Sequence, residues 1–179
     1  GSYGIWAMRA AMAFVRRAEP WQTCDLLLVD DILLNREELD RHILNNLPPG
    51  RCKFHFSEGR IDSIQDLADV LARVPLEKKR WDLVDVDIQG SELEVFRGSL
   101  APLQWKVHRL HISTHSRHIH LELVSHFRLE GWRVHAERTF FSVSGLGRFG
   151  RFPTKDGHFT VCPLYGECEY NILDYERAA

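Results

Sequence analysis

The hydrophobic and polar positions of the chain alternate between two periodicities. Short apolar, β-rich runs are separated by longer segments with apolar residues three or four positions apart, which is typical of an α/β protein. Breaks at Pro20, Pro48-Pro49-Gly50 and Gly131 separate these segments. The pattern predicts helices over 5–17, 35–46, 61–74, 90–103 and 118–130, and strands over 24–30, 52–56, 81–88, 107–113, 132–141 and 158–164.

The order of these elements predicts a mostly parallel sheet. Helices join the first four strands, so these should run parallel, whereas the last two strands have no helix between them and should pair antiparallel. An α/β sheet does not normally begin with a helix, so we expect a strand to be missing before Gly1. The 179 residues suit one domain, residues 1–179.

Composition narrows the class of protein. A net charge of −2 argues against general nucleic-acid binding, because such proteins usually carry a basic excess. There is no apolar run of membrane-spanning length, and no secretory signal is visible. We therefore expect a cytoplasmic protein with neither a membrane nor a nucleic-acid partner. Reduced thiols are expected for the four cysteines, with a zinc site or a disulfide as alternatives.

Two candidate ligand-binding features precede the centre of the chain. Gly1-Ser2-Tyr3-Gly4 stands directly before a helix, where glycines let the backbone approach a ligand closely, although Gly1-Ser2 also fits a cloning remnant. Asp30 ends the next strand, where a carboxylate can accept hydrogen bonds from both hydroxyls of a ribose. A helix N-cap or a solvated turn is the alternative for Asp30.

The most specific motif lies over 81–98. Asp85 and Asp87 alternate with apolar residues at the end of a strand, and buried aspartates are costly unless they meet a ligand or hydrogen-bond donors. Asp87-Ile88-Gln89-Gly90-Ser91-Glu92 then resembles the D-[ILV]-[EQ]-G-x-E signature of FkbM-type methyltransferases. His111-Ile112-Ser113-Thr114-His115-Ser116, followed by Gly131-Trp132, is similar to the I-G-T-H-S…G-W segment of one branch of that family.

Two substitutions depart from the family pattern. Ser113 replaces the glycine of that branch, and Gln89 stands where many members have glutamate. The resemblance nevertheless extends over nearly the whole chain, with the opening Gly-Ser-Tyr-Gly similar to the end of the family's glycine motif. It implies a Rossmann-like class I methyltransferase, a three-layer sandwich with a C-terminal antiparallel hairpin and the first strand missing.

The resemblance also implies a reaction and its residues. The cofactor would be S-adenosyl-L-methionine, and the acceptor a hydroxyl of a small molecule or sugar. His115 is the expected general base, because imidazole is partly neutral near pH 7, and Asp87 is the second catalytic candidate. A purely structural hydrogen bond is the alternative for both. The expected cofactor-binding residues are Gly1, Ser2, Tyr3, Gly4, Asp30, Ser57, Glu58, Asp87 and Gln89.

Other interpretations stay open on the sequence. A non-catalytic, truncated or degenerate methyltransferase fold that serves in protein interaction is the main rival. Five histidines over 108–120 raise a metal enzyme as a third hypothesis, but strand alternation should separate them, so no metal is expected. The arginine- and phenylalanine-rich segment 138–152 could stack on single-stranded nucleic acid, form a lid over the acceptor, or be an irregular loop.

Overall fold

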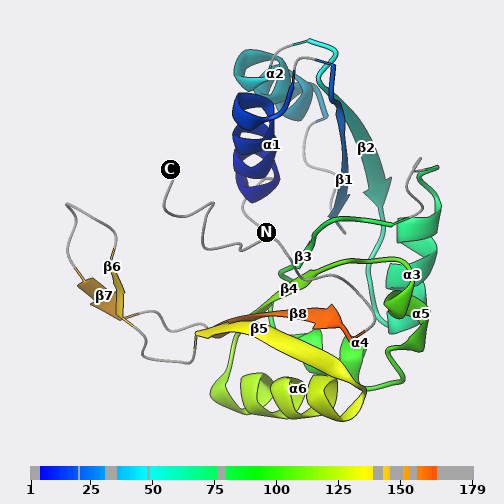
Figure 1. Cartoon of the computed structure of the whole chain (residues 1–179), viewed down its shortest axis with the longest axis vertical. Helices are drawn as coiled ribbons and strands as arrows, with labels where there is room; N and C mark the ends of the chain where they lie inside the picture. The colour runs from blue at the N-terminus through cyan, green and yellow to red at the C-terminus, as the bar shows by residue number, and fades with distance from the viewer. Residues whose placement is uncertain are drawn as a thin grey trace. The chain divides into compact units, whose positions relative to one another are not determined.

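The computed structural model describes residues 5–19, 21–30, 36–47, 49–75, 80–138, 143–145, 151–153 and 157–164. These residues form a mixed α/β structure in two compact units (Figure 1). The first unit takes in Gly1–Arg60 with Glu169–Ala179, and the second Ile61–Cys168. The expectation of a single domain over 1–179 stays a prediction, and each unit is described by itself.

The first unit is a β-α-β arrangement preceded by a helix. Its elements are α1 (Ile5–Arg17), β1 (Cys24–Asp30), α2 (Arg36–Asn46) and β2 (Cys52–Glu58), and β1 pairs in parallel with β2. Ala11 of α1 and Ile43 of α2 are buried in a core that includes Leu26 and Phe54 from the strands. Both helices therefore pack against the strand pair, whose residues on that side are partly buried.

A disulfide joins Cys24 to Cys52 in this unit. The two residues are register partners on adjacent strands, and their Cα atoms lie 4.6 Å apart, within the range that a disulfide needs. Cys162 is disulfide-bonded as well. The expectation of reduced thiols is therefore wrong for these three cysteines, because their spacing in the sequence does not reveal which strands pair. Disulfides are rare in cytosolic proteins, and the expected cytoplasmic location stays a prediction.

The second unit contains a four-stranded sheet of order β3-β4-β8-β5. Its strands are β3 (Val84–Val86), β4 (Leu110–Thr114), β5 (Trp132–Arg138) and β8 (Gly157–Pro163). β3 and β4 pair in parallel, whereas β8 runs antiparallel to both β4 and β5. The predicted antiparallel pair is confirmed, with its last strand inserted beside β4. The prediction that all six strands share one sheet stays open, since each unit has its own hydrogen-bonded strands.

The described part of the second unit has four helices. They are α3 (Ile64–Ala72), α4 (Glu92–Phe96), α5 (Ala101–Gln104) and α6 (Arg117–Leu129). The single helix predicted over 90–103 is wrong: the chain leaves the helix after Phe96 and starts another at Ala101. Gly98 and Ser99 favour a turn, Ser99 accepts a hydrogen bond from the backbone of Ala101, and a proline in the first turn begins the new helix.

The segment between β5 and β8 holds a short antiparallel hairpin of β6 (Val143–Gly145) and β7 (Arg151–Pro153). The sequence does not predict these strands. The remaining residues of the expected lid, 139–142 and 146–150, lie outside the described residues, so the lid stays a prediction.

An aromatic cluster holds α6 against the sheet. Phe127 is fully buried, and its ring contacts Phe96 of α4, Trp132 of β5 and Phe159 of β8 at centroid distances of 5.5, 5.5 and 5.7 Å. Figure 1 shows α6 lying along the face of the sheet that carries these strands. One side chain of α6 thus connects a helix and two strands.

We expect Phe127→Ala to lower the free energy of unfolding by about 3–5 kcal/mol, because it leaves a cavity among three aromatic rings. Chemical denaturation monitored by circular dichroism measures the change. Leu129→Ala on the same helix is the matched control: this side chain is 84% exposed, and its removal should cost less than about 0.5 kcal/mol. Equal losses for the two variants would contradict the packing described above.

Candidate functional site

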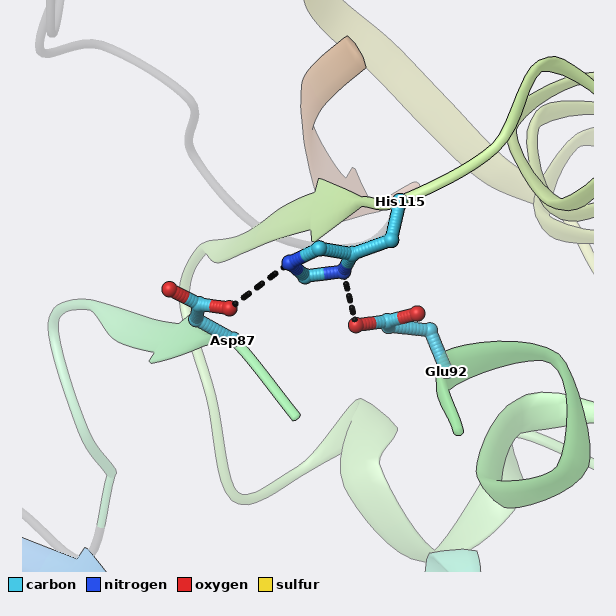
Figure 2. Close-up of side chains that lie close together, drawn as sticks. All are labelled: Asp87, Glu92 and His115. Carbon is cyan, nitrogen blue, oxygen red and sulfur yellow. Dashed lines mark hydrogen bonds and ion pairs between the residues drawn. The ribbon is translucent and has the colours of Figure 1, made fainter. Parts of the chain in front are cut away.

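Parallel pairing brings the residues after β3 and β4 to one edge of the second unit's sheet. Val86 at the end of β3 aligns with Ile112 of β4, and Asp87 and His115 follow the two strands. The strand alternation turns Val84 and Val86 into the core. Asp87 and His115, the two residues that the sequence singles out for catalysis, therefore lie side by side (Figure 2).

A tight turn connects β3 to α4. Gln89 has φ 56° and Gly90 φ 104°, both in the left-handed region that favours glycine. The side-chain amide of Gln89 donates to Asp87 Oδ1 over 2.8 Å. A glutamine in this conformation is strained, and such strain concentrates at functional sites. The turn fixes the position of Asp87 through this hydrogen bond, and the chain then continues directly to Glu92.

Glu92 is the first residue of α4, and its side chain is completely buried. Its Oε1 accepts a hydrogen bond from the backbone N–H of Gly90 over 3.1 Å. The same oxygen lies 2.8 Å from Nδ1 of His115. Its Oε2 has no hydrogen-bond partner among the described residues. The sequence reasoning missed Glu92 as a site residue, although it is the glutamate of the Gly90-Ser91-Glu92 motif.

His115 lies between two carboxylates. Its Nε2 lies 3.3 Å from Asp87 Oδ1, and its Nδ1 faces Glu92, so the ring bridges the ends of β3 and α4 (Figure 2). The His115 side chain is 23% exposed and that of Asp87 is 32% exposed. Solvent or a substrate can therefore reach the Asp87 side of the ring, whereas the Glu92 side is closed.

One structural alternative, that His115 caps the following helix, does not hold. The N-cap of α6 is Ser116, whose side chain accepts a hydrogen bond from the backbone N–H of Ile119 over 3.1 Å. His115 does not cap the helix, and both of its ring nitrogens face carboxylates. Its catalytic role stays a prediction, with a purely structural hydrogen bond as the alternative.

The three side chains also have the spacing of a metal site. Asp87, Glu92 and His115 each offer a donor atom, and these atoms lie within 4.8 Å of one another. Among the described residues, no other member of the histidine cluster belongs to such a group. His120 is buried against Thr114, and His111 contacts Thr160, so the cluster is divided as expected. The expectation that the protein uses no metal stays a prediction.

The predicted ribose-binding carboxylate lies in the first unit. Asp30 is the last residue of β1 and aligns with Glu58, the last residue of β2, with Ser57 just before it. The backbone N–H of Gly59 donates to the carbonyl oxygen of Asp30 over 3.0 Å. Asp30, Ser57 and Glu58 are thus brought together at one strand edge. Gly1, Ser2, Tyr3 and Gly4 lie outside the described residues, and their convergence with Asp30 and Asp87 stays a prediction.

Asp85 adds negative charge beside Asp87. Its side chain is exposed, yet the surrounding protein removes part of its hydration. This desolvation, and then the charge of Asp87, raise the pKa of Asp85 from 3.8 to about 6. Asp85 aligns with His111 on the neighbouring strand.

Part of the chain is similar in sequence to a known protein. The sequence is 34% identical over 70 residues to a protein named "Putative methyltransferase" from Jannaschia sp. (strain CCS1), covering 39% of this chain. The match covers 25% of the length of that relative. No protein-family model matches the sequence. No helix within the described residues has the length and apolar character needed to span a membrane.

Two solved structures have a similar arrangement. One is precorrin 8W decarboxylase from Methanobacterium thermoautotrophicum, with a TM-score of 0.46 at 14% identity, covering 88% of this chain and 90% of the other. The other is a "putative RNA methyltransferase" from Pyrococcus horikoshii, with a TM-score of 0.46 at 9% identity, covering 90% and 82%.

We expect stability to fall as the pH rises from about 4 to about 6, because of Asp85. The pKa of Asp85 is higher in the folded state than in the unfolded state, so the folded state binds more protons over this pH range. The free energy of unfolding falls as the pH rises and the Asp85 proton dissociates. Solvent exposure limits the effect to about 1 kcal/mol. Denaturant unfolding at a series of pH values should show this loss in the wild type and not in Asp85→Asn. Asp82→Asn changes another exposed aspartate and should keep the pH-dependent loss of stability. The same loss in Asp85→Asn as in the wild type would show that Asp85 is not its cause.

Proposed function

We propose that the chain is a methyltransferase domain that uses S-adenosyl-L-methionine and methylates a hydroxyl oxygen of a small molecule or sugar. The observation that carries the proposal is the juxtaposition of His115 and Asp87 at the ends of two parallel strands. Both residues belong to the stretches that resemble FkbM-type methyltransferases. The partial likeness to a protein named as a methyltransferase agrees with it.

Each unit, taken by itself, has acceptor groups that suit one part of this cofactor. Asp30 and Glu58 end adjacent strands, and carboxylates at this position accept hydrogen bonds from ribose hydroxyls. Asp87 presents a carboxylate to the positively charged amino group of a methionine moiety, and the Gln89 amide donates to this carboxylate. The cofactor supplies a reactive methyl group on a sulfonium, and so the protein has to align the acceptor and remove a proton.

His115 is the proposed general base. Its side chain is partly exposed, and Nε2 faces the partly exposed Asp87, whereas Nδ1 faces the buried Glu92. An acceptor hydroxyl within hydrogen-bond reach of Nε2 would donate its proton there as the oxygen becomes nucleophilic. Asp87 lies beside that nitrogen and would orient the acceptor or the methionine moiety.

We expect Asp30→Ala to weaken binding of S-adenosylhomocysteine by about 2–4 kcal/mol, through two lost charge-assisted hydrogen bonds. Isothermal titration calorimetry measures the change directly. Asp25→Ala at the other end of β1 is the matched control and should leave the affinity unchanged. Absence of binding by the wild-type protein would favour the rival proposal, a non-catalytic domain that serves in protein interaction.

We expect His115→Ala to lower kcat by about 10²–10⁴-fold and to leave the affinity for S-adenosylhomocysteine nearly unchanged. The assay is methyl transfer to a panel of hydroxylated small molecules and sugars. His118→Ala, an exposed histidine on α6, controls for the loss of an imidazole. A loss of less than tenfold, or one that only follows the melting temperature, would make His115 structural and leave Asp87 as the candidate base.

A further inference from the structure

The burial of Glu92 needs an explanation that the proposed reaction does not yet give. The side chain is 0% exposed, and an ionised carboxylate removed from water is costly unless donors or positive charge surround it. One oxygen accepts from the backbone N–H of Gly90 and lies 2.8 Å from Nδ1 of His115, while the second oxygen has no partner among the described residues. Such an incompletely compensated acid is poor support for the fold alone.

The contacts of His115 determine where its proton lies. A neutral imidazole carries one N–H, and only one ring nitrogen can donate. Nδ1 makes the shorter contact, 2.8 Å, to a carboxylate that is completely buried, whereas Nε2 is 3.3 Å from the partly exposed Asp87. The proton of the neutral ring therefore belongs on Nδ1, which leaves the lone pair of Nε2 on the accessible side.

We propose that Glu92 is a positioning residue, which holds His115 in the Nδ1–H form and stabilises the imidazolium formed when Nε2 takes a proton. This inference rests on the proposed function. The O–H bond of the acceptor breaks, its proton bonds to Nε2, and the oxygen's electron pair forms the new O–CH₃ bond. The C–S bond of the sulfonium breaks, with its electron pair remaining on sulfur.

The geometry suits the charged state of the ring that this step produces. An imidazolium has an N–H on both nitrogens, and here one carboxylate faces each of them (Figure 2). Fixed groups aimed at the charge that develops during a reaction lower its barrier, since they need no reorganisation. Glu92 contributes the buried half of this arrangement, and Gly90 fixes Glu92 in turn.

A divalent cation on the same three side chains is the competing interpretation. The donor atoms of Asp87, Glu92 and His115 have suitable spacing. However, the two ring nitrogens face different carboxylates. A cation bound by Nε2 and Asp87 would therefore not be bound by Glu92, which would only hydrogen-bond to the His115 ligand. A metal-bound Nε2 could not accept a proton.

Histidine tautomers measured by long-range ¹H–¹⁵N NMR test the positioning role without any assay of activity. In the wild-type protein, neutral His115 should carry its proton on Nδ1. Glu92→Gln keeps a carbonyl oxygen for Nδ1–H and should retain this form, whereas Glu92→Ala should move the proton to Nε2, facing Asp87. An Nε2–H form in the wild type, or no change in Glu92→Ala, would overturn the proposal.

Kinetics provide the second readout. Glu92→Ala should lower kcat by about 10²–10⁴-fold, as loss of the carboxylate partner of a catalytic histidine does elsewhere. Glu92→Gln, which removes the charge and keeps a carbonyl oxygen, should also lower kcat, because the imidazolium loses its buried counter-charge. The KM for the acceptor and the affinity for S-adenosylhomocysteine should stay unchanged in both. A higher KM with an unchanged kcat would contradict the positioning role.

Glu137→Gln is the matched control. Glu137 also contacts a histidine, with its Oε1 3.3 Å from Nε2 of buried His120, but this pair lies between α6 and β5. The control should change thermal stability and leave kcat and the His115 tautomer unaltered. Loss of activity in EDTA, with recovery on adding Mn²⁺ or Mg²⁺, would favour the cation and refute the proposal.

The two readouts separate failure of this inference from failure of the proposed function. If the protein transfers no methyl group but His115 carries its proton on Nδ1 only while Glu92 is present, the reaction is wrong and the positioning is correct. If methyl transfer is measured and Glu92→Ala is as active as the wild type, the reaction stands and Glu92 has no part in it.

Discussion

The parallel pairing of β3 with β4 is the constraint on which the candidate site depends. It sets Val86 beside Ile112, and from that register Asp87 and His115 leave the sheet at the same edge. β4 pairs with β8 on its other side, where Phe159 aligns with Ile112. β4 is therefore held by a neighbouring strand on each side. A shift of one residue would reverse which side chains face the core, so the buried valines fix the position of the polar ones.

The second constraint is the turn that follows β3. It returns the chain toward the strand end within a few residues, and the buried Glu92 thereby contacts Nδ1 of His115 (Figure 2). Gln89 is held in a left-handed conformation and bonded to Asp87, so the turn and the acid are ordered together. The apolar packing of α4, through buried Val95 and Phe96, anchors the helix that carries Glu92. The packed apolar residues of α4 therefore hold in place the buried Glu92 carboxylate, whose removal from water is costly.

The fold could be predicted from the sequence wherever periodicity is strong. Helix α1 has the predicted bounds, and the strand ending at Asp30 was placed to the residue. The predicted helix 90–103 fails because the apolar spacing continues through Gly98 and Ser99, where local backbone preferences prevail. The Cys24–Cys52 disulfide depends on strand register, which no local pattern encodes.

The site was predictable only in part, for a similar reason. Asp87 and His115 could be located because they follow strands, and parallel strands end at a common edge. Glu92 is the first residue of a helix, where a charged side chain ordinarily faces water. Its burial results from the sharp turn before it, which the sequence indicates only through Gly90. The one glutamate that matters most to the geometry thus resembled an ordinary residue of a helix start.

The place of β8 has a consequence for the order in which the protein can be made. Within the described residues β5 pairs with β8 alone, so Trp132–Arg138 has no hydrogen-bonded neighbour until Gly157–Pro163 has been synthesised. β4 likewise lacks its second neighbour until then. On the ribosome, the second unit therefore cannot close its sheet progressively from the N-terminus. It has to wait for its last strand to leave the exit tunnel, and the apolar strands made earlier stay exposed to chaperones in the meantime.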